Sequence, residues 1–334
     1  MTAAEAGGII NVAKPIGLTS FGVVARVRRM MGFRHVGHCG TLDPFAEGVL
    51  PILLGKATGA ARYMENYGKS YRVVVRFGTF TDTQDLTGRP VGGRTPTAGE
   101  LEAMRMDGYQ LLRGAVDSLM GDRLQTPPMY SAVKIDGKHL YEYARKGIDV
   151  ERTGRLIHIY RADILGISAD GDSLEMTVDF DCSKGTYIRT LCQDLGELTG
   201  FGAHAAALVR TACGPFSITG AISLEQLGQM TSDAGEDRIK NLRDAGILLP
   251  VEYAFPDMLS AHADGDTALR FIQGRPITAS EAGLAENVLS DTRVALHGPG
   301  GFVGVGMIRR DAEDRTFLYA ERVFADREDY QKRV

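Results

Sequence analysis

Residues 71–77 alternate between apolar and mostly charged side chains, in the order Tyr-Arg-Val-Val-Val-Arg-Phe. A period of two places the apolar side chains on one face of a β-strand, so the segment predicts a strand with one face packed against a core. Strand patterns also cover residues 8–13, 156–167 and 173–182, and helical apolar spacing covers residues 20–31, 99–121, 140–146 and 186–198. This mixture predicts an α+β fold.

Three segments carry further local signals. Ser20 precedes the apolar spacing of residues 20–31 and is the expected helix cap. Residues 99–121 predict a helix with weak points at Gly108 and Gly114, since glycine disfavours helix interiors. In residues 37–55, apolar side chains alternate with glycine, proline and a few polar groups, so we expect a shaped, partly buried loop.

The chain has 334 residues, more than one compact core usually holds, so we expect two packed units. Residues 231–249 are polar with a helical pattern, and the composition changes at Pro250. Beyond that point, residues 293–297, 302–308 and 317–324 alternate in short runs separated by turns, as in a small β-barrel. We place the boundary between a domain of residues 1–248 and a domain of residues 249–334.

Cysteine spacing and hydropathy limit the class of protein. The four cysteines form no C-x-x-C pair, which gives neither a zinc signature nor a disulfide framework. No apolar run approaches the roughly 20 residues needed to span a bilayer. We therefore expect a cytoplasmic protein without a membrane segment.

The net charge of −4 hides a polarity along the chain. Residues 9–76 hold ten Lys and Arg against three acidic residues, whereas residues 231–334 hold thirteen basic against eighteen acidic residues. A basic front part suggests that a polyanion approaches one face, although ordinary solvated charge would give the same counts.

The run G-H-C-G-T-L-D-P at 37–44 fixes a carboxylate, Asp43, between glycines and a proline in a mostly apolar segment. This setting suits a nucleophile or a general base. Taken alone, the run favours a capping role, as for many Asp residues before proline. The motifs in the rest of the chain reverse that preference.

Eight runs, in the same order along residues 9–214, resemble the TruB-type pseudouridine synthases. They are I-N-V-x-K-P-x-G-x-T-S at 10–20, G-H-x-G-T-L-D-P at 37–44, G-V-L-P-I-L-L-G at 48–55, K-x-Y at 69–71, T-D-T-x-D-x-x-G at 81–88, P-x-x-S-A-x-K at 128–134, L-Y-E-Y-A-R-x-G at 140–147 and C-S-K-G-T-Y-I-R at 182–189. The resemblance implies a catalytic domain with a mixed, mainly antiparallel sheet flanked by helices. Residues 271–277 are similar to part of a PUA-type barrel, although the acidic balance of this region is unusual for an RNA-binding module.

The resemblance also implies catalytic roles for three residues. Asp43 would attack the ribose anomeric carbon or assist departure of uracil, which then rejoins through carbon 5. Arg189 would pair with Asp43 and keep it ionised. Tyr71 would stack on the displaced base and help remove the carbon 5 proton, whereas the residues alone favour a core aromatic.

Further residues receive supporting roles from the resemblance. His38 would lie beside the space that the uridine vacates, and Tyr187 would line the pocket near Arg189. Lys14 and Lys184 are candidates for phosphate or scaffold contacts. Asp85 has a supporting role, since two carboxylates in a short turn usually cap backbone amides.

The implied reaction is conversion of uridine 55 in the T loop of tRNA to pseudouridine, with no cofactor and no metal. The expected partner is the T arm of tRNA, with Arg26 and Arg29 among the candidates for backbone contacts, and we expect a monomer. For Arg26 and Arg29, the alternative is that their charges serve only to keep the protein soluble.

Other functions remain open from the residues alone. His35, His38 and Cys39 could suggest a metal site, but no matching pair follows downstream. A non-catalytic tRNA-binding protein or RNA chaperone would not require the Asp43, Tyr71 and Arg189 set. A nucleoside glycosidase would need a second carboxylate across the sugar.

Overall fold

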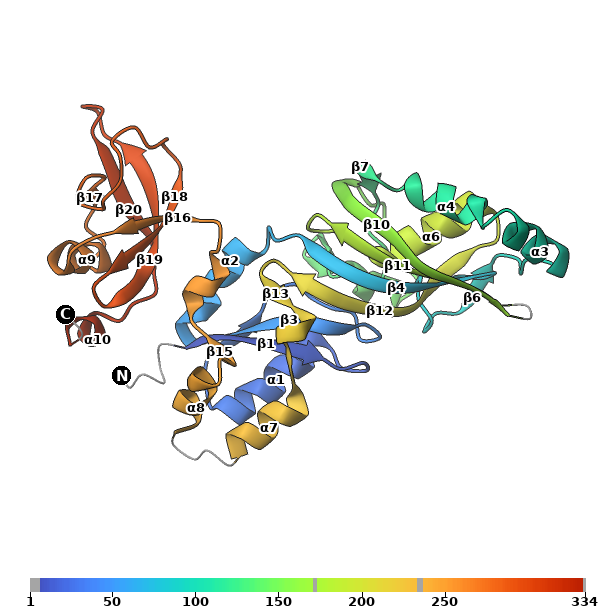
Figure 1. The fold of residues 1–334 in the computed structure, drawn as a ribbon, viewed down its shortest axis with the longest axis horizontal. Coiled ribbons are helices and arrows are strands. Elements are labelled where there is room, and N and C mark those ends of the chain that lie inside the picture. Colours follow the sequence, from blue (N-terminus) through green and yellow to red (C-terminus); the bar gives the residue numbers. More distant parts are fainter. Residues whose placement is uncertain (1–6, 171–172, 233–236, 333–334) are drawn as a thin grey trace.

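The computed structural model describes residues 7–170, 173–232 and 237–332. In these residues the largest sheet has the strand order β14-β1-β3-β12-β4-β11-β10-β7, with β2, β13 and β15 attached to β3, β12 and β1 (Figure 1). The β1–β14 and β3–β12 pairs are parallel, and the other pairs are antiparallel. Its strands are β1 (Gly8–Lys14), β2 (Val36–His38), β3 (Glu47–Leu54), β4 (Lys69–Phe77), β7 (Gly121–Gln125), β10 (Arg155–Asp170), β11 (Ser173–Cys182), β12 (Ala203–Cys213), β13 (Phe216–Ser217), β14 (Ile222–Ser223) and β15 (Leu248–Leu249).

Helices cover the two halves of this sheet separately. One core lies between β1, β3 and the helices α1 (Ser20–Met31), α7 (Leu224–Ser232) and α8 (Arg238–Asp244). A second core lies between the β4, β11 and β10 half and the helices α3 (Ala98–Met106), α4 (Gln110–Asp117) and α6 (Ile188–Thr199). Shorter elements are α2 (Ala61–Met64), η1 (Gly55–Ala60), η2 (Ile218–Gly220) and η4 (Val251–Ala254). The mixed, mainly antiparallel sheet flanked by helices agrees with the predicted α+β class.

Strand β4 shows why the alternation of residues 71–77 was informative. Tyr71, Val73, Val75 and Phe77 are buried, while Arg72 and Arg76 are exposed. The exposed arginines pair with Asp179 and Glu175 on the neighbouring strand β11. Burying each large apolar side chain stabilises the fold by roughly 1.5–3 kcal/mol, so one face of β4 anchors the core.

Two local predictions need correction, and a third is refined. Residues 47–54, expected as part of a loop, form β3, because their apolar run is a strand buried on both faces. Thr19, not Ser20, caps α1 by accepting from the Gly22 amide. The helical segment 99–121 is broken at Gly108, one of its two predicted weak points, since Gly108 and Tyr109 adopt left-handed backbone angles between α3 and α4.

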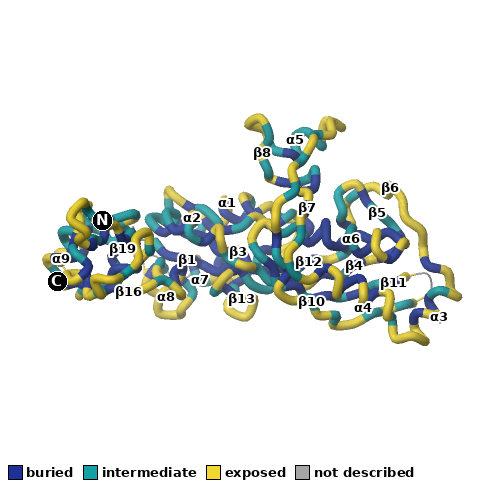
Figure 2. Tube along the Cα trace, turned by 90° about the horizontal axis from the view of Figure 1, so that it is seen from above, coloured by how far each residue is buried: buried dark blue, intermediate teal, exposed yellow. Residues whose placement is uncertain are grey.

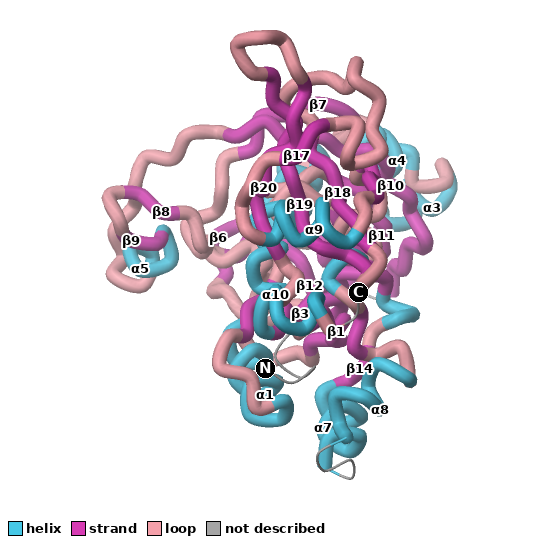
Figure 3. Tube along the Cα trace, turned by 90° about the vertical axis from the view of Figure 1, so that its left-hand side faces the viewer, coloured by secondary structure: helices cyan, strands magenta, loops and turns pink. Residues whose placement is uncertain are grey.

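A small segment stands away from the sheet. The strands β8 (Lys134–Ile135) and β9 (Lys138–His139) and the helix α5 (Leu140–Ala144) project from the body in two perpendicular views (Figures 2 and 3). A separate two-stranded sheet pairs β5 (Phe80–Thr81) with β6 (Pro90–Gly92). The turn after β5 carries Asp85, and the base of the projecting segment carries Tyr130.

The C-terminal unit contains a second sheet, with the order β16-β18-β19-β20-β17. Its elements are β16 (Leu259–His262), α9 (Gly265–Ile272), β17 (Ile277–Thr278), β18 (Arg293–Gly298), β19 (Gly301–Arg310), β20 (Thr316–Val323) and α10 (Arg327–Gln331). The three strands predicted here are present, but the curled sheet is open rather than a closed barrel, because β16 and β17 pair only on one side in the described residues. Ion pairs of Lys56 with Asp326 and Arg62 with Glu321 join the unit to the η1 and α2 region.

Within the described part of the chain, no helix is both long and apolar enough to cross a bilayer.

Candidate active site

A cavity of about 370 Å³ opens where β4, β12, the β2–β3 loop, the start of α6 and the base of the projecting segment meet. The residues lining it are Gly40, Thr41, Leu42, Asp43, Lys69, Tyr71, Ser131, Ala132, Val133, Arg155, Gly185, Thr186, Tyr187, Ile188, Arg189, Leu208 and Arg210. Asp43 is the one carboxylate among these described residues, while four of them are Lys or Arg. The wall therefore suits an anionic ligand with one reactive acid.

The β2–β3 loop holds Asp43 through contacts on both sides. Ser20 at the start of α1 accepts from the Leu42 amide at 2.9 Å and donates to the Leu42 carbonyl at 3.2 Å. On the other side, the Gly17 amide donates to the Pro44 carbonyl at 2.7 Å. The N-terminal motif thus fixes the loop that carries the carboxylate.

Lys14, at the end of β1, hydrogen-bonds to the backbone of the same loop. Its Nζ donates to the carbonyls of Ala46 at 2.6 Å, Pro15 at 2.9 Å and Pro44 at 3.4 Å. Only 1% of the residue is exposed. Burial lowers the pKa of Lys14 to about 8, against the charges of Asp43 and Glu47. Of the two roles considered for Lys14, the scaffold contact matches this placement.

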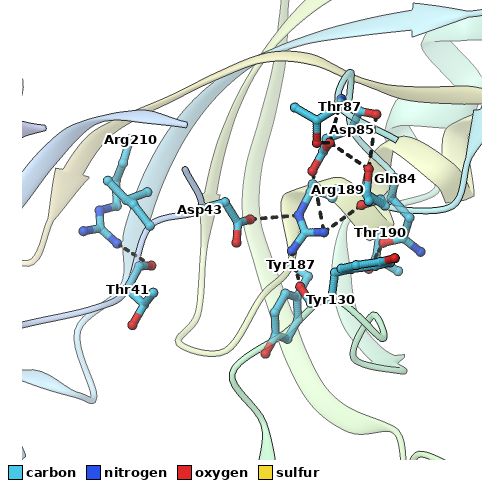
Figure 4. Close-up of polar contacts among 12 residues, drawn as sticks. Thr41, Asp43, Gln84, Asp85, Thr87, Tyr130, Tyr187, Arg189, Thr190 and Arg210 are labelled. Atoms are coloured by element: carbon cyan, nitrogen blue, oxygen red, sulfur yellow. Dashed lines mark hydrogen bonds and ion pairs between the residues drawn. The ribbon is translucent and has the colours of Figure 1, made fainter. Parts of the chain in front are cut away.

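Arg189 brings a guanidinium against Asp43 from a distant part of the sequence (Figure 4). Its Nε lies 2.8 Å from Asp43 Oδ2, while Nη1 donates to the Thr83 carbonyl at 2.7 Å and Nη2 to the Tyr130 carbonyl at 2.8 Å. The arginine is 3% exposed, and each of its three side-chain nitrogens contacts a protein acceptor. It lies in the first turn of α6, as its motif predicted.

Two opposing effects set the charge of Asp43. Burial raises the pKa of the Asp43 carboxyl above that of an ordinary aspartate, the Arg189 guanidinium opposes this shift, and the charge of Asp85 adds to it. Arg189 therefore acts in the predicted direction, but burial is the larger influence. Since 36% of the side chain faces the cavity, a ligand can reach the carboxylate.

Asp85 lies next to the Arg189 guanidinium but does not line the cavity. Its Oδ1 accepts from Thr83 Oγ1, the Thr87 amide and Thr87 Oγ1, and its Oδ2 lies 3.8 Å from Arg189 Nη1. These bonds fix the turn whose Thr83 carbonyl also accepts from Arg189. Asp85 thus holds the turn that contacts Arg189 and lies outside the cavity lining.

Tyr71 lies in the cavity wall on β4, beside Arg210. Burial raises the pKa of Tyr71 to about 12, while the Arg210 guanidinium and its hydrogen bond to the phenol oppose the shift. The phenol is therefore neutral near neutral pH.

Arg210 is a cavity residue that the sequence did not reveal. It is 1% exposed and donates to the carbonyls of Val49 at 2.7 Å and Gly40 at 2.9 Å. Gly48 permits this contact between β3 and β12, since a Cβ there would lie 2.3 Å from the Arg210 carbonyl. The only signal was one arginine in the largely apolar run 203–213, which is ambiguous without the fold.

The other predicted site residues fall into two groups. Tyr187 lines the cavity, and its backbone exchanges hydrogen bonds with the Gln125 side chain. His38 is outside the cavity lining, and its ring contacts Phe21 edge-on at 5.3 Å, where burial lowers its pKa. Lys184, Arg26 and Arg29 are exposed and also outside the lining, and Lys184 contacts Asn66.

Among the described residues, no group of three or more His, Cys, Asp and Glu is arranged to hold a metal ion. The geometry thus gives no support to a site built from His35, His38 and Cys39.

The fold matches solved structures over nearly its whole length. A chain in the crystal structure of an archaeal box H/ACA sRNP Nop10–Cbf5 complex aligns with a TM-score of 0.70 and 23% identity, covering 98% of this chain and 88% of that one. A chain in a Cbf5–Nop10–Gar1 complex aligns with a TM-score of 0.71 and 25% identity, covering 98% and 87%. The chain thus shares its fold with the matched chains of these Cbf5-containing complexes.

Sequence comparison narrows this class to one family. The family model described as TruB family pseudouridylate synthase (N terminal domain) matches residues 28–188, and that of the tRNA pseudouridylate synthase B C-terminal domain matches residues 189–256. The tRNA pseudouridine synthase B of Alkaliphilus oremlandii (strain OhILAs) is 37% identical, covering 96% of this chain and 99% of that protein. The protein of the same name from Geobacillus thermodenitrificans (strain NG80-2) is 42% identical, covering 74% and 78%.

The chain belongs to the TruB family of pseudouridine synthases. It is an isomerase that converts uridine in tRNA to pseudouridine. A non-catalytic RNA-binding or chaperone role is not favoured.

Proposed function

We propose that this enzyme modifies uridine 55 in the T loop of tRNA and that Asp43 is its catalytic carboxylate. The observation that carries the proposal is the Asp43–Arg189 ion pair in a basic cavity with no second lining carboxylate among the described residues. A glycosidase would need a second carboxylate to activate water, whereas base isomerisation needs one acid against the sugar. Asp85 does not meet that need, because its carboxylate is committed to the turn behind Arg189.

The reaction begins at the glycosidic bond. An oxygen of Asp43 attacks carbon 1′ or assists departure of uracil, and the electron pair of the broken bond leaves with the base. Arg189 favours the ionised form of the carboxylate against the effect of burial, and it fixes the carboxylate's orientation. After the base turns over, carbon 5 bonds to carbon 1′ while any bond between carbon 1′ and Asp43 breaks. Tyr71 helps to remove the proton from carbon 5, and N1, which kept the electron pair of the broken glycosidic bond, takes up a proton.

The target uridine must leave its stack before it reaches Asp43. Flipping a base costs a few kcal/mol of lost stacking, which side-chain rings can partly replace. Two rings near the β2–β3 loop can stack in this way: His38 and Phe21, which contact each other edge-on. Phe21 is 74% exposed. Tyr71 and Tyr187 supply rings inside the cavity.

Exposed basic residues outside the cavity bind tRNA in this proposal. The exposed Arg26, Arg29 and Lys184 contact phosphates of the T arm, while Lys14 acts as a scaffold for the Asp43 loop. Residues 1–248 form the catalytic domain, and residues 249–334, with their curled sheet, form a PUA-like domain. The enzyme acts as a cytoplasmic monomer and uses neither a cofactor nor a metal.

The test is to incubate unmodified tRNA transcript with wild-type protein or D43N, without added nucleotide or metal, and to map pseudouridine by chemical adduct and primer extension. D43N should bind tRNA with near wild-type affinity but leave uridine 55 unmodified. The matched control is D163N, which changes an exposed carboxylate paired with Arg161 on β10 and should remain active. Modification by D43N at the wild-type rate would refute the assignment.

A further inference from the structure

Ser131 places a buried hydroxyl in the wall of the cavity. The residue is 5% exposed, yet its Oγ has no hydrogen-bond partner. A buried hydroxyl without a partner loses its bonds to water and gains nothing in return, so such groups are rare unless a ligand completes them. The cavity that Ser131 lines also contains the Asp43 carboxylate.

The backbone on both sides of this hydroxyl is anchored. The Tyr130 carbonyl accepts from Arg189 Nη2 at 2.8 Å, and the Ser131 carbonyl accepts from the Tyr141 amide at 3.2 Å. Arg189 in turn holds Asp43. The Tyr130 carbonyl, which immediately precedes Ser131, and the Asp43 carboxylate are thus held by the same guanidinium (Figure 4).

The Tyr187 phenol lies within reach of the serine. Burial raises the pKa of Tyr187, and a hydrogen-bonding contact with the Ser131 hydroxyl opposes that shift. This contact does not meet hydrogen-bond geometry, so Ser131 Oγ still lacks a well-formed bond. Thr186 provides a contrast in the same wall, because its hydroxyl already donates to the Ser183 carbonyl at 2.9 Å. Ser131 is therefore a cavity-lining hydroxyl whose hydrogen bonding a ligand can complete.

We propose that Ser131 donates a hydrogen bond to a carbonyl oxygen of the uracil base while that base lies in the cavity. The proposal rests on the proposed function, in which the target uridine enters this cavity beside Asp43. Uracil presents two carbonyl oxygens, O2 and O4, and a serine hydroxyl can donate to either.

The same bond would assist the chemical step. When the bond between carbon 1′ and N1 breaks, the electron pair leaves with the base and spreads over N1, O2 and O4. A fixed donor in a closed site stabilises charge that develops in this way more than it stabilises the neutral base. Ser131 would then act mainly on kcat.

The experiment crosses S131A with two modified substrates. Unmodified tRNA transcripts carry uridine, 2-thiouridine or 4-thiouridine at the target position, and single-turnover rates are measured with wild type and S131A. Sulfur accepts hydrogen bonds poorly, and its electronic effect on the base is the same with both enzymes. S131A should slow uridine conversion about tenfold to a hundredfold, with the thermal midpoint of unfolding retained.

For one of the two thio substrates, the further loss seen with wild type should be absent with S131A, because the bond is already gone. T186V is the matched control. The fold-reductions in rate caused by T186V and by each thio substitution should multiply when the two are combined. If the S131A and thio effects multiply for both substrates, or if S131A reacts within twofold of wild type, the proposal is wrong. Should S131A not fold, S131C, which keeps the side-chain size and only a weak donor, replaces it in the same cycle.

D43N separates this proposal from the one it rests on. Loss of activity in D43N together with independent S131A and thio effects would remove the role of Ser131 alone. Activity retained in D43N would remove the assignment of the cavity itself.

Discussion

The Nε atom of Arg189 lies 2.8 Å from Oδ2 of Asp43, and the same guanidinium donates to the carbonyls of Thr83 and Tyr130. One buried side chain therefore joins the Asp43 loop, the Asp85 turn and the base of the projecting segment. Removing one partner of such a buried pair leaves an uncompensated charge, which is strongly destabilising. The arginine thus couples the geometry of three segments to the state of one carboxylate.

R189K should keep the charge but lose most of this geometry. A lysine ammonium cannot present the planar fork that reaches Asp43, Thr83 and Tyr130 together. Because charge-assisted bonds are lost, we expect kcat to fall by roughly 100-fold or more in single-turnover assays. The control is R76K, which makes the same change in an exposed pair with Glu175 and should alter the rate little. Equal rates for R189K and wild type would contradict a positioning role of the guanidinium.

D85N should shift the pH profile without abolishing activity. Asp43 must be ionised to act, so the rate falls as pH drops through its pKa. The charge of Asp85 raises the pKa of Asp43, and removing that charge lowers it. The acid limb of the kcat profile should therefore move to lower pH in D85N. D82N, in the same turn but exposed, is the control and should keep the wild-type limb. A shift to higher pH in D85N would reverse the expected sign.

Y71F should reveal which step uses the phenol. The pKa of Tyr71 is raised to about 12, so its oxygen acts as a neutral hydroxyl across the working pH range. If this oxygen takes part in removing the carbon 5 proton, Y71F makes that removal slower than glycosidic cleavage. A primary isotope effect should then appear with tRNA deuterated at carbon 5 of the target uridine, and be larger than with wild type. A slow Y71F enzyme without any such effect would confine Tyr71 to stacking.

Local patterns predicted most of the elements, and the reasons are visible in particular residues. The alternation around Val73 and Val75 gave β4, because one face of that strand meets the core. The run 47–54 failed as a loop prediction, because β3 is buried on both faces and shows no alternation. Glycines at 48 and 55 resembled turn signals, although Gly48 serves the close approach of β12.

The site was predictable only where a motif carried it. Asp43 and Arg189 were named from the resemblance, and the fold brings their side chains together. Arg210 lay in no motif, and Ser131 lay in the P-x-x-S-A-x-K run but received no role. Their importance comes from tertiary contacts: one reaches the Gly40 carbonyl across strands, and the other has no well-formed partner inside a cavity. Neither condition leaves a periodic trace in the sequence.

K14M should loosen the loop that carries Asp43. The Lys14 ammonium donates to the carbonyls of Pro15, Pro44 and Ala46, and methionine of similar length removes this donor from all three. Each buried acceptor left without a partner costs about 1–3 kcal/mol. We expect a lower free energy of unfolding and a reduced kcat, measured by denaturant titration and single-turnover kinetics. K240M, at an exposed position on α8, is the control for loss of a lysine.

The same variant tests the sign of the Lys14 shift. Folding lowers the pKa of Lys14 from 10.5 to about 8, so between these values the unfolded chain binds the extra proton. Wild-type stability should therefore rise relative to K14M as pH increases from about 8 toward 10.5, by at most about 3.4 kcal/mol, and stay level below pH 8. The three carbonyl acceptors favour the ammonium and make the rise smaller. A wild-type advantage that shrinks over this interval would show that the buried ammonium is stabilised by folding, with its pKa raised instead of lowered.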